Sequence, residues 1–280
     1  MFSSYFFLPA DKKKFIDKTD SLEATNFIFD LEESVYYGNI DICIENLSNI
    51  IVKNNYSVRF PVNYKNPQIT KDALLKLYNI GFRTFVLPKI ETTDDLKNII
   101  EFNNLIGLKQ VKYAIIVESP IALLNIELLI RLGKENIDYI LIGSHDYCNI
   151  IGCKHTLDNL LYLRLKILAV CKAFKIPIID IVSTQTQNVD EFTMECISAF
   201  NMGFDGKAII HPMQLDVLNS ALYYSKMEVQ EAKYVHEQLK KSDMNKFSII
   251  KINGNIYEKP HLKRIFDIIE WNKKKNYYGI

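Results

Sequence analysis

Residues 111–125 read VKYAIIVESPIALLN, an apolar run that ends in a single carboxylate at Glu118. The run has the length of a buried strand. Ser119 and Pro120 follow directly, and these residue types favour the N-cap and the first turn of a helix. The stretch therefore predicts a strand followed by a helix, with the Glu118 carboxylate left free at the carboxyl end of the strand.

Seven further apolar runs have a similar length. They occupy residues 5–10, 26–32, 57–63 and 84–90, and others begin near residues 139, 176 and 206. Most of the eight runs start about 26 to 37 residues apart, which is the length of a strand, a helix and two loops. Helical spacing of apolar residues separates them at 72–80, 123–133 and 161–174.

This alternation predicts an α/β protein whose parallel sheet closes into a (β/α)8 TIM barrel. We expect the barrel to occupy residues 1–238, with a C-terminal helical extension at residues 239–280. A doubly wound open sheet is the alternative.

Composition narrows the function classes. The formal net charge is +1, and the lysine runs at 12–14 and 273–275 are short, so we expect no nucleic-acid partner. No apolar run approaches the ~20 residues that cross a bilayer, and we expect no membrane partner. The five cysteines contain no CxxC pair and no signal peptide precedes them, which favours reduced thiols in the cytoplasm.

Polar residues gather where the predicted strands end, and active sites of this fold lie at that end of the barrel. They are Asp30, Glu32, Glu33, Arg59, Asn63, Lys89, Glu91, Glu118, Asp146, Asp180 and His211. An acid just past a strand is often only a helix cap, and TTDDL after Glu91 favours that interpretation there. His211 is expected to pack and hydrogen-bond at the rim.

Glu118 and Asp146 follow adjacent predicted strands, which lie about 4.8 Å apart. Two carboxylates with the remaining positions left to water and substrate are a usual way of holding Mg²⁺. Without a partner they would repel each other. A cation, a shared proton or a neighbouring Lys or Arg would each resolve the repulsion, and spacing alone leaves all three open.

Eight short motifs, in order, are similar to the citrate lyase β-subunit group of the HpcH/HpaI aldolase family. They are FFLPADKKKF, FIFDLEESV, VRFPVN, FVLPKIET, IIVESP, LIGSHDY, IIDIVS and GFDGKAIIHPMQLDVLN, and they span about 220 residues. GFDGKAIIHPMQ is the most specific of them. The resemblance implies a Mg²⁺-dependent carbon–carbon lyase on a (β/α)8 barrel.

The resemblance also implies site roles. Glu118 and Asp146 would bind Mg²⁺, with Mn²⁺ as a second acceptable ion, and Asp30, Glu32 and Glu33 would order metal-bound waters. Arg59 would be catalytic and bind the carboxylate and oxo oxygen of the substrate. Lys89 would support substrate binding, and Gly143 and Ser144 would leave room for the oxo acid beside the metal.

A C-terminal segment, GNIYEKP, matches a family motif that reads Gly-x-x-x-Asp-x-Pro and reaches into a neighbouring subunit. Glu258 stands at the acid/base position, so the resemblance implies a homo-oligomer, a trimer or hexamer, with a swapped extension. The longer Glu side chain shifts the base by about an ångström. A solvated charge before Pro260 is the alternative interpretation of Glu258.

Two more departures from the family concern its thioester-using members. Ser3 stands where those members carry an arginine, and Ala10 replaces a glycine, which leaves open whether a coenzyme A thioester is bound. His145, Cys148, Cys153 and His155 lie close in the sequence, but their spacing fits no zinc pattern.

The sequence thus predicts a Mg²⁺-dependent lyase or aldolase that cleaves or forms a β-hydroxy acid, free or as an acyl-CoA, with a 2-oxo acid partner. An acyl thioester hydrolase on the same metal site is one alternative. A barrel that binds ligands without turnover inside a larger complex is another.

Overall fold

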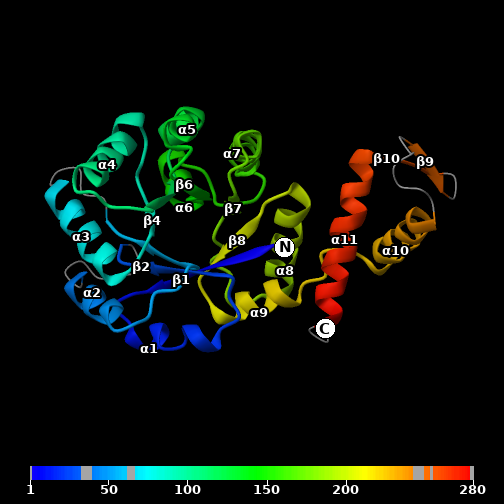
Figure 1. Cartoon of the computed structure of the whole chain (residues 1–280), viewed down its shortest axis with the longest axis horizontal. Coiled ribbons are helices and arrows are strands. Elements are labelled where there is room, and N and C mark those ends of the chain that lie inside the picture. The colour runs from blue at the N-terminus through cyan, green and yellow to red at the C-terminus, as the bar shows by residue number, and fades with distance from the viewer. Residues whose placement is uncertain (1, 33–39, 62–66, 242–248, 253–254, 278–280) are drawn as a thin grey trace. The chain divides into compact units, whose positions relative to one another are not determined.

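Eight parallel strands form a closed barrel with helices around it (Figure 1). The computed structural model describes residues 2–32, 40–61, 67–241, 249–252 and 255–277. The strands are β1 (Ser3–Pro9), β2 (Asn26–Asp30), β3 (Tyr56–Arg59), β4 (Thr84–Leu87), β5 (Lys112–Val117), β6 (Ile137–Ile142), β7 (Ile178–Asp180) and β8 (Gly206–Ile209). Pairing of β1 with β8 closes the ring. The predicted (β/α)8 barrel is confirmed, and the open-sheet alternative is wrong.

Helices connect the strands. They are α1 (Lys13–Ile16), α2 (Ile40–Ser48), α3 (Pro67–Ile80), α4 (Thr93–Leu105), α5 (Pro120–Gly133), α6 (Ser144–Ile151), α7 (Leu161–Phe174), α8 (Val189–Met202) and α9 (Pro212–Ser220), with a 3₁₀ turn at Thr19–Ser21. Helix α5 starts as its sequence predicts, since the Ser119 hydroxyl accepts a hydrogen bond from the Ala122 N–H at 3.1 Å and Pro120 is its first residue. A capping box between Thr92 and Asp95 starts α4.

Side chains fill the barrel interior. The buried cluster comprises Tyr5, Ile28, Val86, Ala114, Ile116, Tyr139, Leu141, Ile179 and Ala208. Within it the Tyr139 hydroxyl donates to Ser57 Oγ at 3.0 Å, which satisfies the polar end of a buried ring. Phe7 and Val182 pack against this cluster. The interior is therefore a packed core, and room for a ligand is left at the end of the barrel.

Residues 2–219 and residues 220–280 form two compact units. The second contains α10 (Lys226–Lys241), an antiparallel hairpin of β9 (Ile249–Ile252) and β10 (Asn255–Glu258), and α11 (Lys259–Tyr277). Helices α10 and α11 bury an apolar cluster that includes Val235 and Ile268. The expected boundary between residues 238 and 239 lies within α10.

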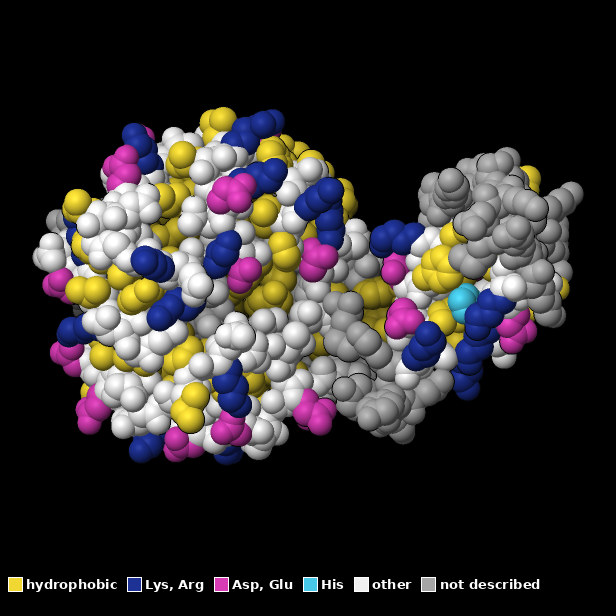
Figure 2. All heavy atoms as spheres, in the orientation of Figure 1, with side chains coloured by type: hydrophobic (Ala, Val, Ile, Leu, Met, Phe, Trp, Pro, Cys, Tyr) yellow, Lys and Arg dark blue, Asp and Glu magenta, His cyan; other side chains and the backbone are white. Residues whose placement is uncertain are grey.

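The surface carries charges of both signs. On the face of the barrel unit seen in Figure 2, basic and acidic side chains are interspersed. Among the helices of the described residues, none combines the length and the apolar character that crossing a membrane requires.

Candidate metal and substrate site

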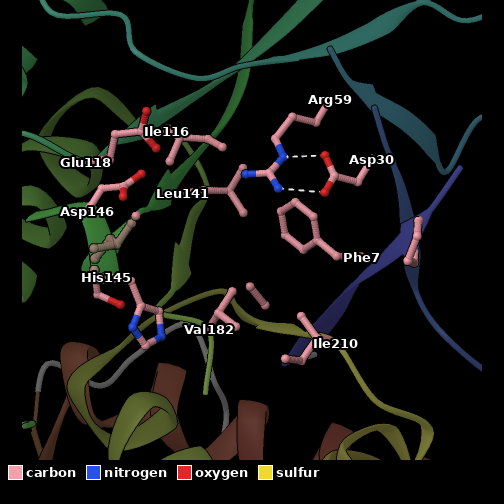
Figure 3. Close-up of a pocket in the computed structure, with 15 residues that line it drawn as sticks. Phe7, Asp30, Arg59, Ile116, Glu118, Leu141, His145, Asp146, Val182 and Ile210 are labelled. Carbon is pink, nitrogen blue, oxygen red and sulfur yellow. Dashed lines mark hydrogen bonds and ion pairs between the residues drawn. The ribbon is translucent and has the colours of Figure 1, made fainter. Parts of the chain in front are cut away.

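A cavity of about 370 Å³ opens at the carboxyl ends of the barrel strands (Figure 3). Its lining residues are Phe7, Pro9, Asp30, Arg59, Ile116, Glu118, Leu141, Ile142, Gly143, Ser144, His145, Asp146, Val182, Ala208 and Ile210. Six of the residues assigned a site role from the sequence are in this set: Asp30, Arg59, Glu118, Gly143, Ser144 and Asp146. The fold therefore brings most of the predicted site to one cavity.

Glu118 follows β5 directly and is 5% exposed. Its Oε1 accepts a hydrogen bond from the backbone N–H of Lys89 at 2.7 Å. Lys89 adopts a left-handed backbone conformation, with φ of 58°, that L residues seldom occupy. The loop after β4 thus supplies a main-chain donor that orients the carboxylate of the next strand.

Asp146 lies in the first turn of α6, and its carboxylate lies beside that of Glu118 at one side of the cavity (Figure 3). Gly143 makes this approach possible. A Cβ at Gly143 would lie 2.4 Å from Glu118 Cβ and 3.0 Å from Glu118 Oε2. Glu118 takes the space where a side chain at residue 143 would begin, and Gly143 also lines the cavity. The room for an oxo acid that the resemblance implies at Gly143 stays a prediction.

The two carboxylates form a pair at one side of the cavity. Among the described residues, no group of three or more His, Cys, Asp or Glu side chains could hold a metal ion. A pair of carboxylates suits Mg²⁺, which keeps several waters and takes further ligands from substrate.

Arg59 lies across the cavity from this pair. Its Nε and Nη2 donate to Asp30 Oδ1 and Oδ2, both at 2.7 Å, and its Nη1 lies 3.4 Å from Glu32 Oε2. The guanidinium also lies 5.2 Å from the centre of the Phe7 ring. Asp30 and Glu32 therefore orient the arginine. Their expected ordering of metal-bound water stays a prediction.

Lys89 also contributes its ammonium, which lies 2.9 Å from Glu32 Oε1. Glu32 Oε2 is buried and has no hydrogen-bond partner among the described residues. Glu33, the third acid of the predicted cluster, lies outside the described residues.

The charges around the cavity favour a divalent cation. Four carboxylates, of Asp30, Glu32, Glu118 and Asp146, face two cations, Arg59 and Lys89, which leaves two negative charges in excess among the described residues. One Mg²⁺ balances this excess. The donor chemistry and the charge therefore both fit the ion that the sequence suggested.

Two other rim residues have structural roles. Arg164 Nε and Nη2 donate to Asp180 Oδ1 and Oδ2, both at 2.9 Å, and both residues are about 1% exposed. The buried Lys207 ammonium lies 3.6 Å from Asp180 Oδ2 and 3.1 Å from Glu195 Oε2. His211 Nδ1 accepts from the Met213 N–H at 3.2 Å, at the start of α9, so its expected hydrogen bond at the rim is present.

Sequence reasoning missed a histidine pair. The rings of His145 and His155 stack with centroids 4.0 Å apart and planes 5° apart. His155 Nε2 lies 2.8 Å from Ser144 Oγ. Burial and the neighbouring His145 lower the pKa of His155, Lys207 adds to this lowering, and Glu195 opposes it. His145 and His155 are ten positions apart in the sequence, and this separation matches no helical or strand period that would predict the stack.

Glu258 ends β10 in the unit of residues 220–280, and its side chain lies outside the described part of the structure. Its expected role is therefore considered below as a proposal.

Comparison with known proteins gives consistent matches. The profile of the HpcH/HpaI aldolase/citrate lyase family matches residues 3–212. The chain is 23% identical to citrate lyase subunit beta of Haemophilus influenzae over 278 residues, covering 95% of each chain. It is 22% identical to (3S)-malyl-CoA thioesterase of Cereibacter sphaeroides over 267 residues, covering 93% of this chain and 91% of that protein.

Among solved structures, CitE of Mycobacterium tuberculosis in complex with magnesium, acetoacetate and coenzyme A superposes with a TM-score of 0.80 at 20% identity. The match covers 96% of this chain and 97% of that one. At this identity the likeness supports the barrel fold.

Proposed function

Because the chain belongs to the HpcH/HpaI aldolase/citrate lyase family, we propose that it is a Mg²⁺-dependent carbon–carbon lyase or aldolase. The reaction would cleave or form a β-hydroxy acid, free or as an acyl-CoA, with a 2-oxo acid as one partner. The observation that carries the proposal is the Glu118 and Asp146 pair at a cavity whose described charged groups have two negative charges in excess.

Glu118 and Asp146 would hold the ion. When bound, Mg²⁺ supplies a Lewis acid that polarises the carbonyl of a 2-oxo acid. Lys89 contributes its backbone N–H, which orients Glu118, and Gly143 contributes the space in which Glu118 lies. Ser144 lines the same cavity, and its hydroxyl lies 2.8 Å from His155 Nε2.

Arg59 would bind the carboxylate and oxo oxygen of the substrate. Its guanidinium is fixed by two hydrogen bonds to Asp30, so little ordering is needed when the ligand arrives. A guanidinium opposite a metal site stabilises negative charge on the oxo oxygen that it contacts.

Glu258 would act as the base for the hydroxyl proton, donated by a neighbouring subunit of a homo-oligomer, a trimer or hexamer. The described carboxylates that line the cavity are Asp30, held by Arg59, and the metal pair. A base delivered from another subunit would complete the set of groups that proton transfer needs.

A thioester hydrolase is the second candidate, because the thioesterase and citrate lyase relatives match at nearly equal identity, 22% and 23%. Ser3 stands where thioester-using members carry an arginine, and serine cannot make the arginine–phosphate contact to coenzyme A, which weighs against this candidate.

Thermal unfolding with Mg²⁺ tests the metal site. With Mg²⁺ at 100 times its Kd, the free energy of unfolding should rise by about 2.7 kcal/mol in the wild type. Pyruvate, oxaloacetate, glyoxylate and acetyl-CoA are then added one at a time. Glu118→Gln should abolish the metal response, whereas Glu127→Gln, an exposed acid on α5 paired with Arg131, should keep it. Equal responses in wild type and Glu118→Gln would show that the metal-site proposal is wrong.

A product assay with a β-hydroxy acyl-CoA separates the two reactions. A lyase releases an oxo acid together with an acyl-CoA, and a hydrolase releases free thiol without an oxo acid. Free thiol alone would exclude the lyase.

A further inference from the structure

The stacked histidines stand at the wall of the cavity. His145 is the second residue of α6 and lines the cavity next to Asp146, while His155 comes from the loop that joins α6 to α7. In Figure 3 the His145 ring lies on the far side of Asp146 from Glu118, with Val182 beside it. One face of its ring is covered by His155 at 4.0 Å.

The remaining wall is poor in polar side chains. Apart from the metal pair and the Arg59–Asp30 pair, the polar side chains among the described lining residues are those of Ser144 and His145. The Ser144 hydroxyl is engaged by His155 Nε2 at 2.8 Å. His145 makes no side-chain hydrogen bond in the described part of the chain. Its ring is thus held by stacking while its nitrogens have no partner there.

We propose that His145 is a substrate-contacting residue that donates a hydrogen bond to an oxygen at the end of the ligand away from Arg59. His155 is the positioning residue that holds this ring and the Ser144 hydroxyl. The inference rests on the proposed function, because that function places a 2-oxo acid between the metal pair and Arg59.

The chemistry of imidazole supports a donor role. In either protonation state the ring carries at least one N–H, so the contact does not depend on titration of His145. A ring stacked face to face keeps its edge free, and the edge carries both nitrogens. The ligand class that fits is a 2-oxo acid extended by an oxygen-bearing group, which is either a second carboxylate or an acyl carbonyl.

Three probes share the 2-oxo acid end and differ in the other end. Pyruvate has no distal oxygen, oxaloacetate has a distal carboxylate, and 2,4-dioxopentanoate has a distal acyl carbonyl. Binding of each is measured by isothermal titration calorimetry with saturating Mg²⁺ in the full-length protein. In the wild type, one or both of the extended ligands should bind more tightly than pyruvate, and which of them does so identifies the distal group.

His145→Phe keeps a stacked ring and removes the N–H. It should raise the Kd of the preferred extended ligand about 10-fold, because one hydrogen bond is lost, and keep the Kd of pyruvate within about twofold of the wild-type value. His145→Gln, which keeps a donor, should restore part of the affinity and serves as the second variant if His145→Phe does not fold. His155→Ala should weaken the same ligand, whereas His155→Phe, which keeps the stack, should weaken it less.

A purely structural role would change all three affinities together or change only thermal stability. Equal weakening of pyruvate and the extended ligands in His145→Phe would overturn this inference and leave the proposed function intact. A wild type that binds none of the three probes with Mg²⁺ would overturn both.

Discussion

Gly143→Ala should disrupt the metal site more than the fold. The added Cβ would lie 2.4 Å from Glu118 Cβ and 2.8 Å from Ile116 Cγ2. Carbon atoms in contact prefer about 3.5–4.0 Å. Glu118 Cβ is anchored to the backbone next to β5, so it cannot rotate away as the end of a long side chain could. The Glu118 carboxylate must therefore move by about an ångström.

The size of the effect follows from this displacement. Overpacking costs about 1–3 kcal/mol of stability. The φ of Gly143 is −86°, which alanine can adopt. The lower conformational entropy of the unfolded alanine variant should therefore offset about 0.4–1 kcal/mol of this loss of stability. Disturbed orientation of a metal ligand lowers affinity about 10- to 100-fold. Mg²⁺ that stabilises the wild type by about 2.7 kcal/mol should then stabilise the variant by about 0.4–1.4 kcal/mol at the same concentration.

Thermal unfolding with and without Mg²⁺ measures both quantities. Gly133→Ala is the matched control, because its Cβ would lie 2.9 Å from Ile137 Cδ1 and 3.0 Å from Leu96 Cδ2, among side chains away from the cavity. The control should change stability and keep the full Mg²⁺ response. A full Mg²⁺ response in Gly143→Ala would refute the reasoning.

Three further predictions concern stability. Arg164→Leu should cost about 3–5 kcal/mol in urea unfolding, because Asp180 stays buried without its bidentate partner, and an unchanged midpoint would contradict this. Ser119→Ala should cost about 1 kcal/mol through the lost cap of α5 and leave Mg²⁺ affinity unaltered by calorimetry, whereas a weaker Mg²⁺ site would show that Ser119 does more than cap. The pKa of His155 is lowered from 6.5, so the unfolded state binds more protons and stability should fall as pH falls below 6.5. Urea midpoints at pH 7.5, 6.5 and 5.5 should decline less in His155→Gln than in the wild type. Equal declines in the two proteins would disprove the assignment.

The barrel could be predicted because its signals are local. Each strand is a short apolar run, and the spacing of the runs reports the helices between them. The Ser119 cap and the Thr92 capping box are likewise encoded within four residues. The strand ends in turn placed Glu118 and Asp146 at one rim.

The parts that escaped prediction depend on contacts between distant segments. The buried pairing of Arg164 with Asp180 joins α7 to β7, and an amphipathic pattern gives no sign that a charged residue faces inward. The ion pair between Glu32 and the Lys89 ammonium depends on the path of the loop after β4, which residue identity does not report. The tight approach of Gly143 to Glu118 is a matter of interatomic distance, which residue identity does not report.

The left-handed backbone at Lys89 has a consequence for how this site tolerates substitution. The group that orients Glu118 is an amide of the main chain, which every residue except proline possesses. Residue 89 could therefore change identity while the carboxylate keeps its donor, and glycine would even relieve the positive φ. Proline would remove the donor. The orientation of Glu118 thus depends on the backbone path after β4. The side chain at residue 89 is constrained by its ion pair with Glu32.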